Sequence, residues 1–322
     1  MVDMLGKKMP SLRLAITDRC NLKCRYCPPF GENYSNVEKG LSLNELLKIL
    51  KVAVEIGINN FKITGGEPLL EKERLSSVLE FLSKTNSMVS VNTNGVELKS
   101  NVDFLLAKNV AYVKVSLDTL NPSKYMKICG VDYLHKTIEG IKTAIAKGLK
   151  TRINMVVIKD NYNEVPAMIK FCQSVGADLK LLDLNYYEDV GKKFWLDNYQ
   201  SLTELTKELS AKSSMRAVVF NEGGYGIPMT LLRLKNINIL IKDSKKGAMY
   251  GDGCKNCPFL PAERKKFYCQ EGIYNLTLTV DGKLKICKHR PDVGVSLRGL
   301  NKKQIKKAMI RIIADFFPGA PV

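Results

Sequence analysis

Short β-rich runs alternate with amphipathic helical stretches from residue 12 to about residue 185 of this 322-residue chain. Such alternation predicts βα units, because neighbouring parallel strands need a long crossover connection that is usually a helix. We expect strands at residues 12–17, 60–64, 88–93, 112–117, 152–158 and 179–183. Six strands of this kind form an open barrel, so the predicted fold class is α/β, with a partial (β/α)6 barrel of the TIM type.

The rest of the chain has a different pattern, and the change predicts its domain organisation. The predicted parts are a barrel at 1–190, a linker at 191–213, a smaller C-terminal α+β domain at 214–298, and a helix with a tail at 299–322. The smaller domain is rich in β patterns and includes a hairpin with its turn at Asp281 and Gly282. The final helix, at 302–316, has an apolar stripe that we expect to cover the open bottom or side of the barrel.

Composition and charge exclude some classes of function. No apolar run approaches the eighteen or so residues of a membrane span, so we expect no membrane association. The net charge of +18 favours anionic ligands, although solvated lysines on helix faces give the same excess. We expect no nucleic-acid partner, because no aromatic-basic platform or groove-reading motif accompanies the charge. The first residues lack the apolar segment of a signal peptide, which predicts a reducing, cytoplasmic location.

Three cysteines follow the first predicted strand. Cys20, Cys24 and Cys27 have the spacing Cys-x3-Cys-x2-Cys. Three thiolates at this spacing can each hold one iron of a [4Fe–4S] cluster, while the fourth iron has no protein ligand. That open iron is a place where a substrate or cofactor binds. The loops at the carboxyl ends of the strands are also where α/β barrels have their active sites.

Zinc and disulfide bonds are the alternatives for this triplet. A tetrahedral zinc site normally takes a fourth protein ligand, often from a second Cys-x2-Cys pair, and no further cysteine or histidine lies within thirty residues of Cys27. Three cysteines cannot pair evenly into disulfides, which are also rare in a reducing compartment. Both alternatives are therefore disfavoured.

Further motifs carry a resemblance to a known family. Tyr26 stands before the last cysteine of the triplet, and the run ITGGEPLL contains Gly65, Gly66 and Glu67. The runs VNTNG, VSLDT and RINMVVIKDNYNE follow. With these motifs the chain resembles the radical S-adenosylmethionine (SAM) enzymes. Among them it is similar to the GTP 3′,8-cyclases of molybdenum-cofactor biosynthesis, from about residue 12 to the C-terminal helix.

The resemblance implies a reaction and its cofactors. In this family the open iron binds the amino and carboxylate groups of SAM, and an electron from the reduced cluster breaks a C–S bond. The resulting 5′-deoxyadenosyl radical abstracts hydrogen from the substrate, and the electron comes from a donor such as ferredoxin or flavodoxin. The residues that the resemblance assigns to SAM binding are Tyr26, Gly65, Gly66, Glu67, Thr93, Ser116 and Asn154. The polar ones have an alternative role as strand-end caps or turn formers.

Four later cysteines resemble those of the auxiliary-cluster module that follows the barrel in these enzymes. They are Cys254, Cys257, Cys269 and Cys287. The resemblance assigns them to a second [4Fe–4S] cluster, and a structural zinc site is the alternative, because four thiols suit tetrahedral zinc. The cyclases have Cys-x2-Cys-x13-Cys, so full ligation by four thiols would make this cluster an electron-transfer or structural one. Cys129 and Cys172 are interpreted as small core residues.

The resemblance also bears on the substrate. The cyclases have an Arg-x-Arg pair where this chain has Asn275 and Thr277, and neither side chain replaces a bidentate guanidinium. The cations that remain at anion-binding positions of the family are Arg13, Lys62, Arg152 and Lys180. The leading hypothesis is an anionic, nucleotide-like small-molecule substrate other than GTP. The alternatives are a radical SAM dehydrogenase or epimerase that modifies a peptide or sugar, and a zinc- or iron-bearing nucleic-acid-binding protein.

Overall fold

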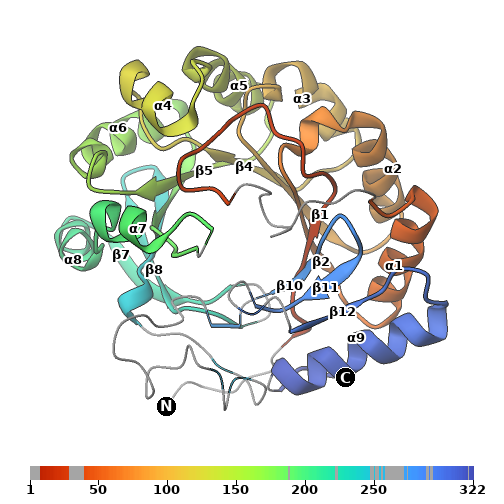
Figure 1. Cartoon of the computed structure of the whole chain (residues 1–322). Helices are drawn as coiled ribbons and strands as arrows, with labels where there is room; N and C mark the ends of the chain where they lie inside the picture. Colours follow the sequence, from red (N-terminus) through yellow and green to blue (C-terminus); the bar gives the residue numbers. More distant parts are fainter. Residues whose placement is uncertain are drawn as a thin grey trace.

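The chain forms a barrel-like sheet with helices on its outside (Figure 1). The computed structural model describes residues 8–28, 40–187, 189–221, 224–246, 250, 254, 257, 272–273, 275–287, 290, 293–317 and 319–322. Among these residues, no helix is long and apolar enough to cross a lipid bilayer. Cys269 lies outside the described residues.

Six parallel strands form the predicted wall of the barrel. They are β1 (Leu12–Ala15), β2 (Asn60–Thr64), β3 (Met88–Thr93), β4 (Tyr112–Ser116), β5 (Thr151–Val157) and β6 (Asp178–Asp183). Each strand pairs in parallel with the next one in the chain. The six predicted strands are therefore confirmed, with small differences at their ends.

Helices connect these strands and pack on the outer face of the sheet (Figure 1). They are α1 (Leu43–Glu55), α2 (Lys72–Ser83), α3 (Leu98–Ala107), α4 (Pro122–Cys129), α5 (Leu134–Ala146) and α6 (Val165–Val175).

The first residues of α1 show how the local sequence determines where a helix begins. Ser42 Oγ accepts a hydrogen bond from the Glu45 amide, and the Glu45 carboxylate accepts one from the Ser42 amide, so two otherwise unpaired amides of the first turn are satisfied.

The two faces of each strand differ sharply in polarity. In β4, Val113 and Val115 are fully buried under the helices, whereas Lys114 and Ser116 line the cavity of the barrel. In β5 the same alternation places Arg152 and Asn154 in the cavity. Neighbouring side chains of a strand point to opposite faces of the sheet, so the polar residues at every second position of these strands face the inside of the barrel. The barrel therefore encloses a polar cavity rather than the apolar core that is usual in closed barrels of this type.

The remaining strands extend the same sheet at both of its edges. They are β7 (Met215–Val219), β8 (Met229–Leu234), β9 (Ile237–Lys242), β10 (Leu276–Leu278), β11 (Lys283–Lys285) and β12 (Gly294–Ser296). β9 pairs in parallel with β6, and β10 pairs in parallel with β1. The described strands thus form one sheet of twelve, in the order β12-β11-β10-β1-β2-β3-β4-β5-β6-β9-β8-β7. The described strands among residues 214–298 belong to this one sheet, and the division into two domains stays a prediction.

The predicted linker contains two helices. They are α7 (Lys192–Asn198) and α8 (Thr203–Ala211). Leu205 and Leu209 of α8 are buried, and α8 contacts β8, so it continues the outer layer of helices. Trp195 stacks on Tyr199 with 4.5 Å between ring centroids. These two helices were not predicted, because short helices in a polar stretch give a weak signal, and the role of the stretch as a linker stays a prediction.

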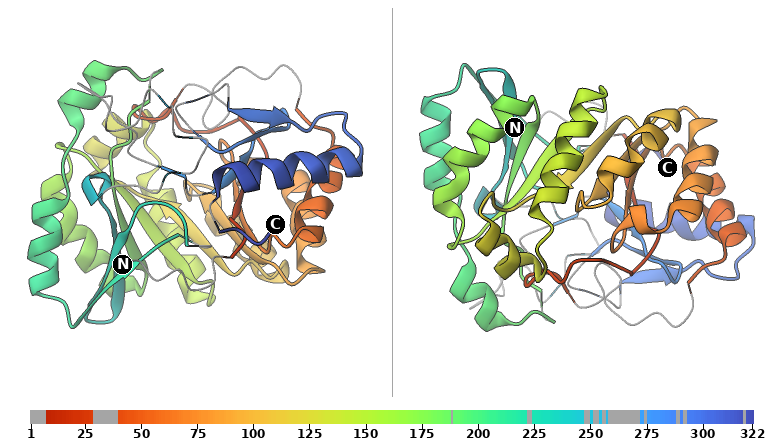
Figure 2. Two further views of the ribbon diagram at one scale, coloured as in Figure 1. Left: turned by 90° about the horizontal axis from the view of Figure 1, so that it is seen from below. Right: turned by 90° about the horizontal axis from the view of Figure 1, so that it is seen from above.

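The last helix, α9 (Lys302–Phe316), has the predicted bounds. It begins at a capping box of Asn301 and Gln304, and its apolar face buries Ile305, Met309 and Ile313. α9 contacts α1, and Figures 1 and 2 show it lying along α1 on the outside of the barrel. This is the position expected of a helix that covers the side of the barrel.

Candidate active site

The cysteine loop, residues 16–28, follows β1 and is held from two sides. On one side it meets the turn after β2, where the Gly66 amide donates to the Thr17 carbonyl and the Glu67 amide to the Arg19 carbonyl, both at 2.7 Å. On the other side it meets the end of α4. The Lys23 amide donates to the Cys129 carbonyl at 2.8 Å, and the Arg25 amide to the Ile128 carbonyl at 2.9 Å. Backbone hydrogen bonds therefore set the position of the loop independently of its side chains.

Gly65 and Gly66 allow this close approach of the two backbones. A Cβ atom at Gly65 would lie 2.2 Å from the Thr17 carbonyl oxygen, and one at Gly66 would lie 2.0 Å from the Arg19 carbonyl oxygen. Gly65 also has a φ of +149°, which L side chains rarely adopt. The missing side chains thus make room for the cysteine loop. Both glycines line the cavity, and their predicted contact with SAM stays a prediction.

Replacement of Gly66 by alanine should displace the cysteine loop. Since the φ of Gly66 is not positive, the expected effect comes from the 2.0 Å clash with Arg19 and not from backbone strain. We expect the iron content after anaerobic reconstitution to fall by up to half, because only the cluster of the cysteine loop would be lost. Gly148→Ala is the matched control, because a Cβ there meets nothing within 4 Å, although its φ of +81° costs about 1 kcal/mol of stability. Equal iron contents in the two variants would contradict this assignment.

Glu67 joins the turns that follow β2 and β3. Its carboxylate accepts hydrogen bonds from the Asn94 amide at 2.7 Å, the Thr93 hydroxyl at 2.8 Å and the Leu69 amide at 3.0 Å. Burial raises the pKa of Glu67 to about 7, and these donors limit the rise. The Thr93 hydroxyl also accepts from the Gly95 amide at 3.0 Å. The Thr93 hydroxyl thus donates and accepts within the protein, as a strand-end cap does, and its predicted contact with SAM stays a prediction.

Glu67 should make the stability of the fold depend on pH. Its pKa is about 7 in the folded chain against an ordinary 4.5, so folding favours the protonated carboxyl. The stability that the protonated Glu67 contributes to the folded state is fully present below pH 4.5 and is lost as the pH rises through 7. As the pH rises through this range, the free energy of unfolding of the parent protein should fall by about 3 kcal/mol relative to that of Glu67→Gln. Urea unfolding at several pH values measures it, and a difference that does not change with pH would refute the expectation.

Cys24 meets a fourth thiol that sequence reasoning treated as isolated. Cys129, the last residue of α4, is buried as predicted, but it also lines the cavity. The pKa of Cys24 is raised well above its usual value. The hydrogen bond between the two thiols is the largest cause, and burial is the next. Cys20 and Cys27 are exposed at the mouth of the same cavity. No signal in the local sequence pairs Cys24 with Cys129, because the contact depends on the packing of α4.

Tyr26 is anchored by a residue that sequence reasoning missed. Its hydroxyl donates to Asp118 Oδ2 at 2.5 Å, and Asp118 Oδ1 accepts from the Val156 amide at 2.8 Å. Burial raises the pKa of Asp118 to about 6. The signal for Asp118 was its place in the run VSLDT, just after a strand that ends in the cavity.

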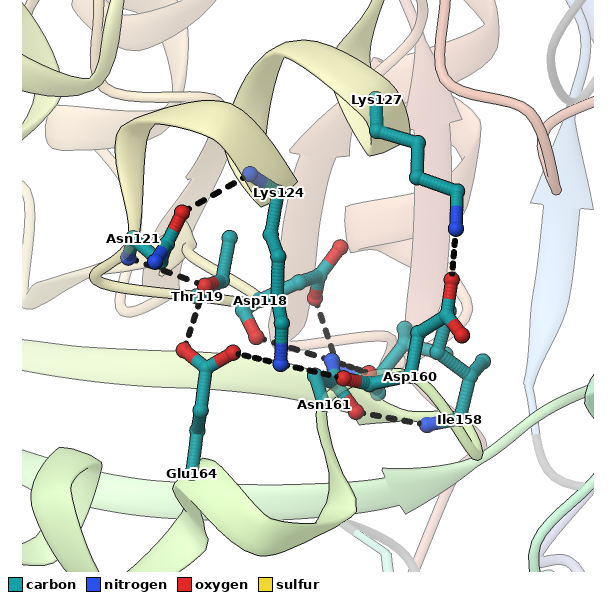
Figure 3. A network of polar contacts seen from close by, with 10 residues as sticks. Asp118, Thr119, Asn121, Lys124, Lys127, Ile158, Asp160, Asn161 and Glu164 are labelled. Carbon is teal, nitrogen blue, oxygen red and sulfur yellow. Dashed lines mark hydrogen bonds and ion pairs between the residues drawn. The ribbon is translucent and has the colours of Figure 1, made fainter.

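A polar network behind Asp118 fixes α4 to the barrel (Figure 3). Asn161 Nδ2 donates to the Asp118 carbonyl at 2.8 Å, and Lys124 forms an ion pair with Glu164 at 2.7 Å. Lys127 pairs with Asp160 at 2.6 Å. These contacts connect α4 with the segment between β5 and α6. Because the end of α4 holds the cysteine loop, the network also positions that loop.

One cavity of about 680 Å³ brings together most of the predicted site residues. The predicted residues that line it are Arg13, Cys20, Cys24, Tyr26, Cys27, Lys62, Gly65, Gly66, Glu67, Thr93, Ser116, Arg152, Asn154 and Lys180. Six basic residues, here called the cation wall, line it from β1, β2, β4, β5, β6 and β9. They are Arg13, Lys62, Lys114, Arg152, Lys180 and Lys242. Sequence reasoning missed Lys114 and Lys242, although each is a charged residue in an otherwise apolar strand pattern.

The residues of the cavity fit a cluster and SAM in their chemistry. The three thiols of the cysteine loop line it, and thiolate is the ligand that iron–sulfur clusters take. The buried Oδ1 atoms of Asn92 and Asn154 accept no hydrogen bond within the described residues, and they suit donors such as the amino and hydroxyl groups of SAM. In the described part of the chain, no three cysteine, histidine or acidic side chains gather at metal-binding distance.

The later cysteines are described only in part. The Cys257 amide donates to the Cys254 carbonyl at 3.0 Å, and Cys254 and Cys287 pack against the core. Since Cys269 lies outside the described residues, their joint ligation stays a prediction. Asn275, which the resemblance places where the cyclases have an arginine, is buried and lines the cavity.

Comparisons with known proteins identify the family of the chain. The family model of the radical SAM superfamily matches residues 14–172. A probable GTP 3′,8-cyclase of Sulfurisphaera tokodaii is 31% identical over 301 residues, which cover 92% of this chain and 87% of that protein. A probable GTP 3′,8-cyclase of Methanococcus maripaludis is 30% identical over 324 residues, covering 99% of this chain and 98% of that protein.

Solved structures show a similar fold. SuiB of Streptococcus suis, bound to the precursor peptide SuiA, matches 97% of this chain and 66% of its own length with a TM-score of 0.62 and 17% identity. anSMEcpe with bound AdoMet and the Cp18Cys peptide matches 95% of this chain and 80% of its own length with a TM-score of 0.60 and 18% identity. These likenesses support the partial barrel. Together with the cysteine loop and the identities above, they show that the chain is an enzyme of the radical SAM superfamily and belongs to its GTP 3′,8-cyclase family.

Proposed function

We propose that this enzyme cleaves SAM reductively and abstracts hydrogen from an anionic, nucleotide-like small molecule. The observation that carries the proposal is a single cavity with the cysteine loop at the carboxyl ends of the strands and the cation wall along their inner faces. Cys20, Cys24 and Cys27 would hold the [4Fe–4S] cluster. When bound, the cluster and SAM supply the 5′-deoxyadenosyl radical after one-electron reduction.

The residues around the cysteine loop would bind and orient SAM. Asn92 and Asn154 offer buried amide oxygens as acceptors, and Ser116 stands opposite Asn154 in the strand register. Glu67 and Asp118 act indirectly, because they hold the turns and the tyrosine that frame the loop. A site fixed by backbone hydrogen bonds and buried carboxylates needs little reorganisation when the ligand binds.

The cation wall would select the substrate. Six basic side chains against the three carboxylates of Glu67, Asp118 and Asp178 leave the cavity lining positive, which favours an anion over a neutral peptide or sugar. The barrel also shields a reactive radical from water, as hydrogen abstraction requires. We further propose a cytoplasmic enzyme whose electron donor is an acidic carrier such as ferredoxin or flavodoxin, which the net charge of +18 would attract.

Counting metals tests the two-cluster part of the proposal. We expect about eight irons per chain after anaerobic reconstitution and about four when Cys20, Cys24 and Cys27 are all replaced by alanine, because each [4Fe–4S] cluster has its own set of thiols. The second set is Cys254, Cys257, Cys269 and Cys287. Iron and zinc are measured by elemental analysis. About one zinc and four irons in the parent protein would refute the second cluster and leave the first intact.

A further inference from the structure

The outer side of the cysteine loop is basic. Arg19, Lys23 and Arg25 are exposed, and no acidic residue stands between Arg19 and Pro28. The three thiols of the same loop line the cavity on its inner side, and two of the three cysteines are exposed. One segment of chain thus presents thiols to the cavity and cations to the solvent.

The end of α4 and the start of α7 continue this basic surface. Gly130, the residue after α4, lies beside Lys23, because a Cβ atom there would be 3.1 Å from Lys23 Cβ. Met126 of α4 is 50% exposed. On the other side, Arg25 lies over the ring of Phe194 of α7, with 5.4 Å between Cζ and the ring centroid. The loop, α4 and α7 therefore share one surface.

The segment after β5 joins α4 to α7 on the same surface. Lys127 pairs with Asp160 at 2.6 Å, and Lys159 Nζ donates to the Leu196 carbonyl at 3.2 Å. The hydrogen bond from Lys127 lowers the pKa of Asp160, and the charge of Arg25 adds to this effect. Leu196 is 51% exposed. Exposed apolar side chains thus stand among cations, and the carboxylate of Asp160 is held in an ion pair.

This composition suits an interface with an acidic protein. Exposed apolar side chains gain stability when a partner covers them, and methionine and arginine are enriched in protein interfaces. The surrounding cations would attract a partner of opposite charge and orient it. The docking surface, as the term is used below, consists of Lys23, Arg25, Met126, Lys127, Lys159 and Leu196.

We propose that the docking surface binds a small acidic protein that carries one low-potential electron, an inference that rests on the proposed function. Electron transfer between proteins requires their redox groups to approach closely, and Lys23 and Arg25 belong to the loop that carries the cluster thiols. One electron leaves the reduced carrier and enters the cluster of the cysteine loop, and no proton or group is exchanged. Complexes of this kind are small and transient, which agrees with a surface that has few apolar side chains.

Reduction of the reconstituted holoenzyme by a reduced, acidic [4Fe–4S] ferredoxin tests the docking surface. When Lys23→Glu and Lys159→Glu are made together, we expect the second-order rate constant at low salt to fall roughly ten- to a hundredfold, because electrostatic steering is lost. Stopped-flow absorbance measures the rate. Added salt should slow the parent reaction but not that of the variant. In calorimetry, oxidised ferredoxin should bind the variant more weakly by a similar factor, and Met126→Gln should also weaken binding.

The matched control changes the net charge equally at another place. Lys303→Glu with Lys307→Glu alters the exposed face of α9, which Figure 1 shows along α1 and away from α4. We expect this control to react with ferredoxin within twofold of the parent. Dithionite should reduce the cluster of each protein to the same extent, because the backbone contacts that hold the cysteine loop are unchanged.

The docking surface would be overturned by a rate constant of the Lys23 and Lys159 variant within twofold of the parent value. An equal loss in the α9 control would also overturn it, since net charge alone would then attract the carrier. Dissociation of a parent dimer by the same variant would assign the surface to a second copy of the chain instead. A parent cluster that dithionite cannot reduce would refute the proposed function, whereas the binding of ferredoxin would still decide the docking surface.

Discussion

Replacing Cys24 by alanine should abolish the formation of 5′-deoxyadenosine from SAM under reducing conditions. The parent protein should form it slowly even without substrate. Three thiolates are needed to leave a single iron open, so the loss of one removes the geometry at which SAM would bind. Chromatography of anaerobic reactions with dithionite measures the product, and we expect it to be undetectable in Cys24→Ala.

Cys129→Ala is the matched control for this variant. It removes a thiol from the same cavity and from contact with Cys24, but not from the cysteine loop. We expect it to keep its iron and to form 5′-deoxyadenosine like the parent. If Cys24→Ala cleaved SAM at the parent rate, the radical SAM activity would be refuted. If Cys129→Ala failed and Cys24→Ala did not, the fourth thiol would be the ligand in place of Cys24.

GTP should bind weakly and should not be converted to the 3′,8-cyclised product. The resemblance to the cyclases places Asn275 and Thr277 at the positions of two arginines, and Asn275 lines the cavity. Loss of a charge-assisted contact costs roughly 1.5–3 kcal/mol, so two losses weaken binding by roughly a hundred- to ten-thousandfold. Incubation with GTP, SAM and reductant, followed by analysis for the cyclised nucleotide, tests this. Efficient formation of that nucleotide would show that the chain is a cyclase despite the two replacements.

Arg152→Ala separates substrate binding from SAM cleavage in the same experiment. Its guanidinium is part of the cation wall, whereas the cysteine loop is held by backbone contacts elsewhere. With the true substrate, we expect this variant to lose far more turnover than uncoupled 5′-deoxyadenosine formation. Equal losses in both reactions would mean that Arg152 supports the barrel as a whole rather than the substrate.

Local sequence was sufficient for most elements of the fold. β2, β3 and α9 have the predicted bounds, because apolar periodicity and capping residues are properties of a short stretch of chain. The joining of β10 to β1 and of β9 to β6 was not predictable in this way. Parallel pairing uses backbone hydrogen bonds that carry no side-chain signature. Here it links Leu12 with Leu276 and Leu179 with Ile239, which are far apart in the sequence. The helices α7 and α8 were missed for a different reason, since short helices in a polar stretch give a weak signal.

The sequence by itself determined the chemistry of the site: the three spaced thiols, the glycines beside Glu67, and four of the six members of the cation wall. The tertiary structure decided which groups act on one another. It placed Cys129 against Cys24, Asp118 under Tyr26, and Lys114 beside Arg152. Spacing along the chain specifies which side chains a loop or strand can present, whereas the contacts between them depend on how strands pair and helices pack, and these depend on the whole chain.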